Sequence, residues 1–117
     1  MVSHSQCWVQ LGSDIDGEGE GDYSGSAVSL SKDGLVVAIG AYNNDGERAT
    51  NAGHVRVYDW NVLKKSWMQR GGDIDGLSER EKFGSAVSLS EDGSILAIGA
   101  SRNTKYGANT VRASVFM

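Results

Sequence analysis

Two stretches of the chain carry the hydrophobic pattern of paired β-strands. In GSAVSLS (25–31) apolar and small or polar residues alternate, which is typical of a strand with one buried face. LVVAIGA (35–41) is a continuous apolar run, which is typical of a strand buried on both faces. The Asp33-Gly34 pair between them predicts a hairpin, because glycine adopts a positive φ at little steric cost.

The pattern continues after a polar loop. HVRVYDW (54–60) alternates again, and residues 66–74 predict a fourth strand anchored by Trp67, Gln69 and Ile74. No segment combines helical periodicity with caps. The expected unit is therefore an antiparallel meander of four strands.

The chain contains this unit twice. WVQLGSDIDG (8–17) returns as WMQRGGDIDG (67–76), and GSAVSLSKDG (25–34) returns as GSAVSLSEDG (84–93). The motif AIGA occurs at 38–41 and again at 97–100, so all three pairs are separated by 59 residues. Such self-similarity indicates a duplicated structural unit, with a period near that of propeller blades.

The predicted fold class is all-β, with antiparallel four-stranded β-propeller blades in two repeats, as an incomplete propeller or a self-assembling segment. The expected organisation is a disordered tail (1–7), an orphan fourth strand with an acidic turn (8–23), a complete blade (24–76) and a second blade without its fourth strand (77–117). Propellers need more than two blades. We therefore expect either part of a longer repeat array or a homo-oligomer in which the N-terminal strand of each chain fills the last blade of its neighbour. Three chains of two blades would give a propeller of six blades.

Charge and composition narrow the partners. The formal net charge is −4, and clustered basic residues of the kind that bind nucleic acid or anionic lipid are lacking. No run is long and apolar enough for membrane insertion, and the N-terminus lacks a signal-peptide pattern. Cys7 is the only cysteine, so no internal disulfide is expected. The compartment is left open by these features.

The repeat resembles the FG-GAP repeats of integrin α-type propellers. Phe83-Gly84 matches the FG dipeptide and Gly99-Ala100 matches the start of GAP, whereas the first copy has Ser24-Gly25 and Gly40-Ala41. It is also similar to tandem W-x-Q-x-G-x-D-I-x-G and S-A-V-S-L-S-x-D-G arrays of microbial eukaryotes. The resemblance implies a propeller with an interaction role, in an extracellular setting.

The sequence departs from the FG-GAP pattern in two ways. Tyr42 and Ser101 replace the proline of GAP. The hairpins SKDG and SEDG replace the calcium loop that such blades often carry between their first two strands, and they offer too few oxygens for calcium. Calcium binding is therefore not expected at these hairpins.

Two groups of residues are candidates for binding. Alternating carboxylates could hold a calcium ion, the alternative being a solvated acidic turn; they are Asp14, Asp16, Glu18, Glu20 and Asp22. The loops 42–53 and 101–110 differ between the copies, and variable loops on a repeated scaffold often carry specificity. The ligand-binding candidates in these loops are Tyr42, Asn43, Asn44, Asp45, Arg102, Asn103 and Tyr106.

No catalytic constellation is present in the sequence. The histidines His4 and His54 belong to no metalloprotease motif, and no nucleophile elbow occurs. We therefore expect a non-catalytic scaffold for a protein or glycan ligand, without a cofactor other than calcium. The alternatives are a calcium-dependent adhesion module, a lectin, or a truncated gene fragment with no independent function.

Overall fold

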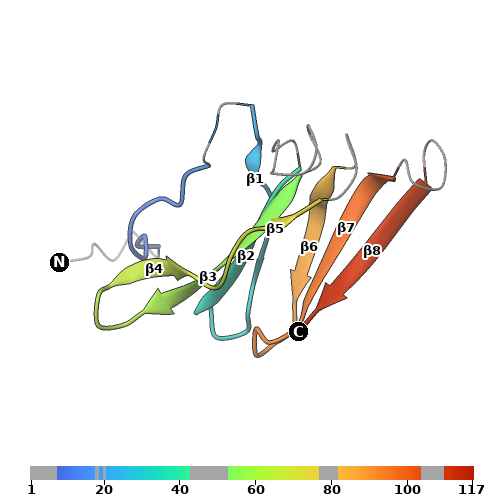
Figure 1. The fold of residues 1–117 in the computed structure, drawn as a ribbon. Helices are drawn as coiled ribbons and strands as arrows, with labels where there is room; N and C mark the ends of the chain where they lie inside the picture. The colour runs from blue at the N-terminus through green and yellow to red at the C-terminus, as the bar shows by residue number, and fades with distance from the viewer. Residues whose placement is uncertain (1–7, 18, 20, 43–52, 77–81, 104–109) are drawn as a thin grey trace.

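The computed structural model describes residues 8–17, 19, 21–42, 53–76, 82–103 and 110–117. Within these ranges the chain is all-β, and no helix is long and apolar enough to cross a membrane. The strands are β1 (Ser24–Leu30), β2 (Val36–Ala41), β3 (His54–Asn61), β4 (Ser66–Gln69), β5 (Ile74–Asp75), β6 (Phe83–Leu89), β7 (Leu96–Asn103) and β8 (Thr110–Phe116). They form two antiparallel sheets that lie face to face and fan apart (Figure 1). The fold class predicted from the sequence is confirmed, as two blades rather than a closed propeller.

The first sheet has the order β1-β2-β3-β4, with β5 also paired to β3. The β1–β2 hairpin turns at Ser31–Gly34, as the Asp-Gly signal predicts. Asp33 accepts hydrogen bonds from Ser31 Oγ at 2.7 Å and from the Leu35 N–H at 3.0 Å. Gly34 has φ of +75°, which explains the glycine at this position. These hydrogen bonds to the charged form lower the pKa of Asp33, the Leu35 N–H contributing most.

The fourth strand of this sheet is interrupted. The sequence predicts one strand over residues 66–74, but β4 ends at Gln69 and β5 begins at Ile74. Gly71 between them has φ of +68°, and Arg70 N–H donates to the Val57 carbonyl at 2.6 Å. A left-handed glycine produces a bulge that breaks the ladder, and β5 then rejoins the same edge of β3.

The second sheet, β6-β7-β8, repeats the first. Lys82 and Gly84 at the start of β6 have φ values of +59° and +91°, against +58° and +90° for Tyr23 and Gly25 at the start of β1. In each copy the register shifts inside the first strand, so both begin with the same bulge. The duplication therefore extends to backbone details.

The hydrophobic core lies between the two sheets. β2 and β3 contribute one side and the second sheet the other; the buried residues are Val36, Ala38, Val55, Val57, Phe83, Leu96, Ile98 and Ala100. Gly40 of β2 lies against Gly84 of β6 so closely that a Cβ on Gly40 would overlap the Gly84 carbonyl oxygen. The sheets are therefore packed as neighbouring blades, with backbones in contact at one end.

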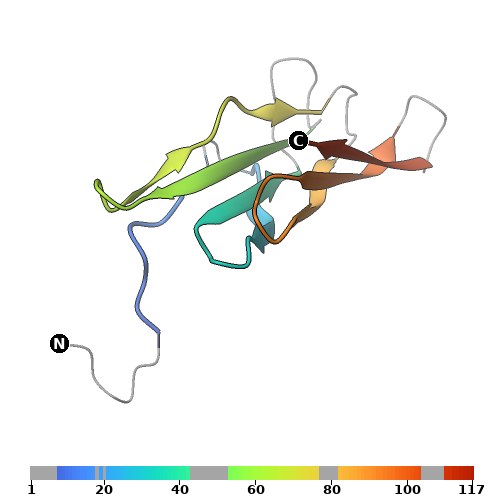
Figure 2. The ribbon, with the colours of Figure 1, turned by 90° about the horizontal axis from the view of Figure 1, so that it is seen from below.

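The orphan fourth strand expected within residues 8–23 is not a strand in the structure. Residues 8–17, here called the N-terminal segment, pair with no described strand. The segment lies beside the β3–β4 hairpin, on the opposite side of the molecule from β8 (Figures 1 and 2). A strand needs a partner edge for its backbone hydrogen bonds. The neighbouring edge of β3 is already occupied by β4 and β5, so the segment stays irregular.

Candidate functional site

One end of the molecule gathers the starts of β1 and β6 and the ends of β2 and β7 (Figure 1). Three side chains meet there, and we call them the tyrosine–lysine cluster: Tyr23, Tyr42 and Lys82. Tyr23 and Lys82 occupy equivalent bulges of the two copies, one residue before β1 and β6. Tyr42 directly follows β2. The duplicated bulge thus brings one side chain from each blade to the same place.

The cluster is held by ring and charge contacts. The rings of Tyr23 and Tyr42 stack with centroids 5.3 Å apart and planes inclined by 13°. The Lys82 ammonium lies 5.3 Å from the centroid of the Tyr42 ring, within the range of a cation–π contact. Tyr23 is 57% exposed, whereas Tyr42 and Lys82 are half-buried. The result is a flat aromatic surface with a positive charge beside it.

The structure describes only some of the predicted ligand-binding residues. Tyr42 lies in the cluster, and Arg102 and Asn103 are the last residues of β7. The remaining candidates lie outside the described residues; they are Asn43, Asn44, Asp45 and Tyr106. Sequence reasoning missed Tyr23 and Lys82, although their matching place before the two GSAVSLS motifs was a usable signal.

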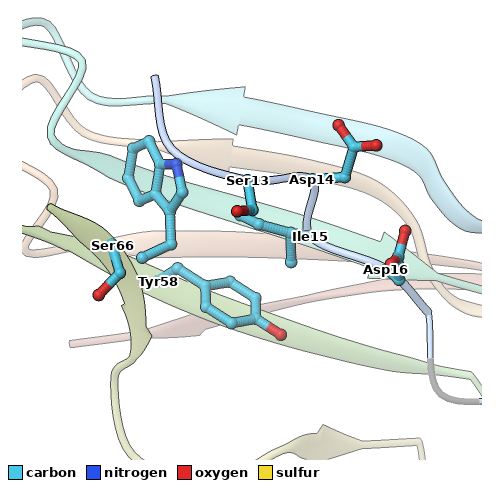
Figure 3. Close-up of a pocket in the computed structure, with 7 residues that line it drawn as sticks. Ser13, Asp14, Ile15, Asp16, Tyr58 and Ser66 are labelled. Atoms are coloured by element: carbon cyan, nitrogen blue, oxygen red, sulfur yellow. The ribbon is translucent and has the colours of Figure 1, made fainter. Parts of the chain in front are cut away.

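A hollow of about 270 Å³ separates the N-terminal segment from the first sheet. It is lined by Ser13, Asp14, Ile15, Asp16, Tyr58, Ser66 and Trp67. Figure 3 shows the Ile15 side chain directed toward the ring of Tyr58, and the carboxylate of Asp14 directed away from it. The Trp67 indole N–H donates to the Leu11 carbonyl at 3.0 Å. The N-terminal segment therefore packs against the first sheet at Tyr58 and Trp67.

The predicted calcium residues are not collected into a cation site in the described part of the chain. Asp14 accepts a hydrogen bond from the Gln10 amide at 2.6 Å, and Asp16 is exposed. Asp22 is half-buried, whereas Glu18 and Glu20 lie outside the described residues. In the described ranges, the group with ligand atoms within 4.8 Å of one another is instead His54, Asp73 and Asp75.

Hydrogen bonds within the fold account for that group. Arg56 donates to both oxygens of Asp73, at 2.8 and 3.1 Å, and the Gln69 amide adds a third hydrogen bond at 2.7 Å. The Arg56 guanidinium, with the Gln69 amide, lowers the pKa of Asp73 although partial burial opposes it. A guanidinium bound to the same carboxylate repels a cation. The group therefore serves to fasten β5 to β3, a role that could not be assigned from the residue pattern alone.

His54 is poorly placed for chemistry. It is 3% exposed, and its Nδ1 lies 4.0 Å from Asp75 Oδ1. A general acid or base must reach its substrate within hydrogen-bond distance. Because His54 is buried, it lacks that access.

The family comparison agrees with the repeat seen in the structure. Residues 14–58 match the FG-GAP repeat. The matched residues run from the acidic turn through β1 and β2 into β3. A search of curated proteins finds no match. The chain thus contains an FG-GAP-like repeat, and the internal duplication places a second copy of the same strand pattern in β6, β7 and β8. FG-GAP repeats are non-catalytic interaction modules built on propeller blades.

Proposed function

We propose that the chain is a non-catalytic interaction module that binds a protein ligand at the tyrosine–lysine cluster. The single observation that carries the proposal is the meeting of Tyr23, Tyr42 and Lys82 at the loop end of two FG-GAP-like blades. Aromatic residues beside a cationic side chain are typical of the central contacts of protein interfaces. Each of the three residues directly adjoins a strand, so little ordering of them is required on binding.

The chemistry of the cluster indicates the kind of ligand surface. The exposed ring of Tyr23 offers a face to an aromatic or aliphatic side chain. The Lys82 ammonium favours a carboxylate beside that side chain. We therefore expect a peptide or protein surface that presents an acidic residue next to an apolar one.

A catalytic role has less support. The polar groups described above are engaged in fastening strands: Asp73 binds Arg56, and Asp33 closes a hairpin. His54 is buried. These roles are sufficient to explain each group without invoking a reaction.

A glycan is the second candidate, and the exposed Tyr23 ring is the observation that favours it. Sugar rings stack on exposed aromatic faces, and the hydroxyl of tyrosine can share hydrogen bonds with them. In this case Lys82 has no required role in binding.

Binding assays can separate the two ligand classes. The chain is probed with an acidic-aromatic peptide library and with a glycan array, together with the variants Tyr42→Ser and Tyr23→Lys. Each variant installs the residue that the other copy holds at that position (Ser101 and Lys82), so each is expected to fold. We expect both to weaken peptide binding about tenfold or more.

Leu63→Ala is the matched control, because Leu63 is 95% exposed in the β3–β4 turn at the opposite end. It is expected to leave binding unchanged. Binding that survives both tyrosine substitutions would contradict the proposed surface. Binding to glycans with no dependence on Lys82→Gln would instead select the second candidate.

A further inference from the structure

The interface between the two blades provides a template for a second interface. In this interface Gly40 of β2 lies directly against Gly84 of β6. The Leu89 N–H donates to Ser29 Oγ at 3.0 Å, and the Lys32 N–H donates to the Glu91 carbonyl at 2.8 Å. The two sheets are equivalent, but they contact each other through opposite faces.

We call the face of each blade that points away from the other blade its outer face. Because the blades are copies, each outer face carries residues equivalent to those that the other blade uses in the internal interface. The outer face of the second blade holds Gly99, Ser88 and Glu91, which are equivalent to Gly40, Ser29 and Lys32. The outer face of the first blade holds Gly25, Leu30 and Lys32, which are equivalent to Gly84, Leu89 and Glu91. The two outer faces therefore repeat most of the residue pairs of the internal interface, with Ser24 in the place of Phe83.

Exposure of apolar side chains marks both outer faces. Val36 and Val57 are each 7% exposed inside the chain, whereas their equivalents Ile95 and Val115 are 41% and 69% exposed. On the first blade, Val28 and Leu30 are 61% and 59% exposed, although their equivalents Val87 and Leu89 pack against the core. Exposed apolar patches of this kind indicate interaction sites.

Gly99 is the most informative residue of these faces. Its equivalent, Gly40, must be glycine because any Cβ would overlap Gly84. A Cβ on Gly99 would meet the Ala86 Cβ at 3.4 Å, an ordinary contact, and Gly99 does not have a positive φ. Among the described residues, neither space nor backbone conformation requires glycine there. The close approach of another backbone does explain it, and a Cβ built on Gly25, the equivalent of Gly84, meets no described atom within 4 Å.

The N-terminal segment already has the local shape of a fourth strand. Gly12 has φ of +74°, like Gly71 with +68° between β4 and β5. Gln10 donates to Asp14 at 2.6 Å, just as Gln69 donates to Asp73 at 2.7 Å. The segment thus reproduces the bulged geometry of β4 and β5, although no described strand is paired with it.

Its position on the first blade also repeats that of β5 on the second. Ile15 and Tyr58 line one hollow, and their equivalents Ile74 and Phe116 line another. The segment therefore lies on the first blade as the fourth strand of a preceding blade would.

We infer that two copies of this chain associate head to tail, through the outer face of the second blade of one and the outer face of the first blade of the other. This contact repeats the internal interface: Gly99 of one copy lies against Gly25 of the other, and the exposed apolar side chains of both outer faces become buried. The N-terminal segment of one copy pairs with the edge of β8 in the other copy, as β4 and β5 pair with β3.

The internal pairing fixes the register of the added strand. β8 pairs with β7 as β3 pairs with β2, so Ala113 takes the place of Val55 and Phe116 that of Tyr58. Since Ile74 faces Val55 and Gln69 faces Tyr58, Ile15 is expected opposite Ala113 and Gln10 opposite Phe116. An interface between unlike faces closes into a ring or grows into a filament.

Light scattering coupled to size-exclusion chromatography tests the association with the 117-residue chain. We expect a mass above that of the single chain, and an increase in Kd of about tenfold or more for Gly99→Ala. Gly99→Ala is expected to keep the circular dichroism spectrum of the parent chain, because its Cβ finds ordinary space. Leu63→Ala removes a 95% exposed side chain outside the interface and is expected to leave association unchanged.

A folded monomer across about a hundredfold range of concentration would overturn the inference. Association that is equally strong in Gly99→Ala would also overturn it, because contact through other open edges does not depend on that glycine.

Disulfide trapping tests the strand addition separately. Chains carrying Cys7→Ser with either Ile15→Cys or Ala113→Cys are mixed under mild oxidation. We expect a mixed disulfide between the two kinds of chain, because directly opposed residues of antiparallel strands come within bonding distance. Replacing Ala113→Cys by Val115→Cys moves the thiol out of register and serves as control. Equal trapping at both positions would contradict the register, and no trapping at either would contradict strand addition.

Discussion

At the scale of single residues, short side chains organise the two β-hairpins at the end opposite the tyrosine–lysine cluster. Asp92 accepts hydrogen bonds from the Ser94 hydroxyl at 2.7 Å, the Ser94 N–H at 3.0 Å and the Ser90 hydroxyl at 2.9 Å. These donors, the Ser94 hydroxyl first, lower the pKa of Asp92 from 3.8 to about 2. Asp33 has an equivalent position and its pKa is lowered by the same kind of contact. Both turns are therefore stabilised by charged carboxylates.

These turns make stability depend on pH in the acid range. A carboxylate whose pKa is lower in the folded chain stabilises it above its ordinary pKa of 3.8, and that contribution is lost as the pH falls toward about 2. We expect Asp33→Asn/Asp92→Asn to lower Tm at about pH 6, with the difference from the parent chain disappearing near pH 2. Thermal melts followed by circular dichroism across this range measure the effect. A difference in Tm that is constant with pH would show that the charges are not responsible.

At the scale of strands, the alternation of residues predicts the elements well but not their pairing partners. The hairpin of β1 and β2 follows from GSAVSLS, LVVAIGA and the Asp-Gly turn. The interruption between β4 and β5 was not predicted, because Gly71 reads as an ordinary residue of the strand predicted over 66–74 until its φ of +68° is known. Residues 8–17 carry the same motif as 67–76, yet only the second copy has an edge to pair with. Whether this motif forms a strand depends on a free strand edge beside it, and sequence patterns do not show where such an edge lies.

The same limit applies to the candidate site. Tyr42 was predicted because its loop differs between the copies. Tyr23 and Lys82 were missed because each belongs to a turn that reads as a connection. Tyr23 meets Tyr42 through the pairing of β1 with β2, and Lys82 reaches Tyr42 only when the two blades pack. Asp14 was a candidate ligand of a cation shared with neighbouring carboxylates, whereas in the structure it accepts a hydrogen bond from the Gln10 amide. Sequence patterns do not reveal which side chains that are distant in sequence come into contact in the folded chain.

The contact of β2 with β6 gives a prediction for these elements. Gly40→Ala places a Cβ against the Gly84 carbonyl oxygen, and backbone on both sides prevents relief by side-chain rotation. We expect a decrease in the free energy of unfolding of about 1–3 kcal/mol, measured by urea denaturation. Gly72→Ala is the matched control, because a Cβ there meets no described atom within 4 Å and its φ is not positive. Equal effects of the two substitutions would mean that the sheets are not in backbone contact at Gly40.

At the scale of the whole molecule, the two sheets share one core and neither contains a core of its own. Phe83 is 2% exposed, and it lies at the start of the second blade where the first blade has Ser24. A Cβ on Gly53 of the first blade would overlap the Phe83 backbone, so the blades are in close contact here. Because most of the buried apolar residues of both sheets form a single cluster between them, we expect both sheets to unfold in one transition.

Phe83→Ala tests this shared core. Removing the ring is expected to lower the free energy of unfolding by about 3–5 kcal/mol, because it leaves a cavity between packed sheets. Amide hydrogen exchange should increase in β2 and β3 of the first blade as much as in β6 and β7, since both sides of the interface lose their packing. Phe116→Ala is the control, because Phe116 is 40% exposed and its loss is expected to cost less. Faster exchange confined to the second blade would show instead that each blade is stable by itself, and that the interface between them is an addition to two independent sheets.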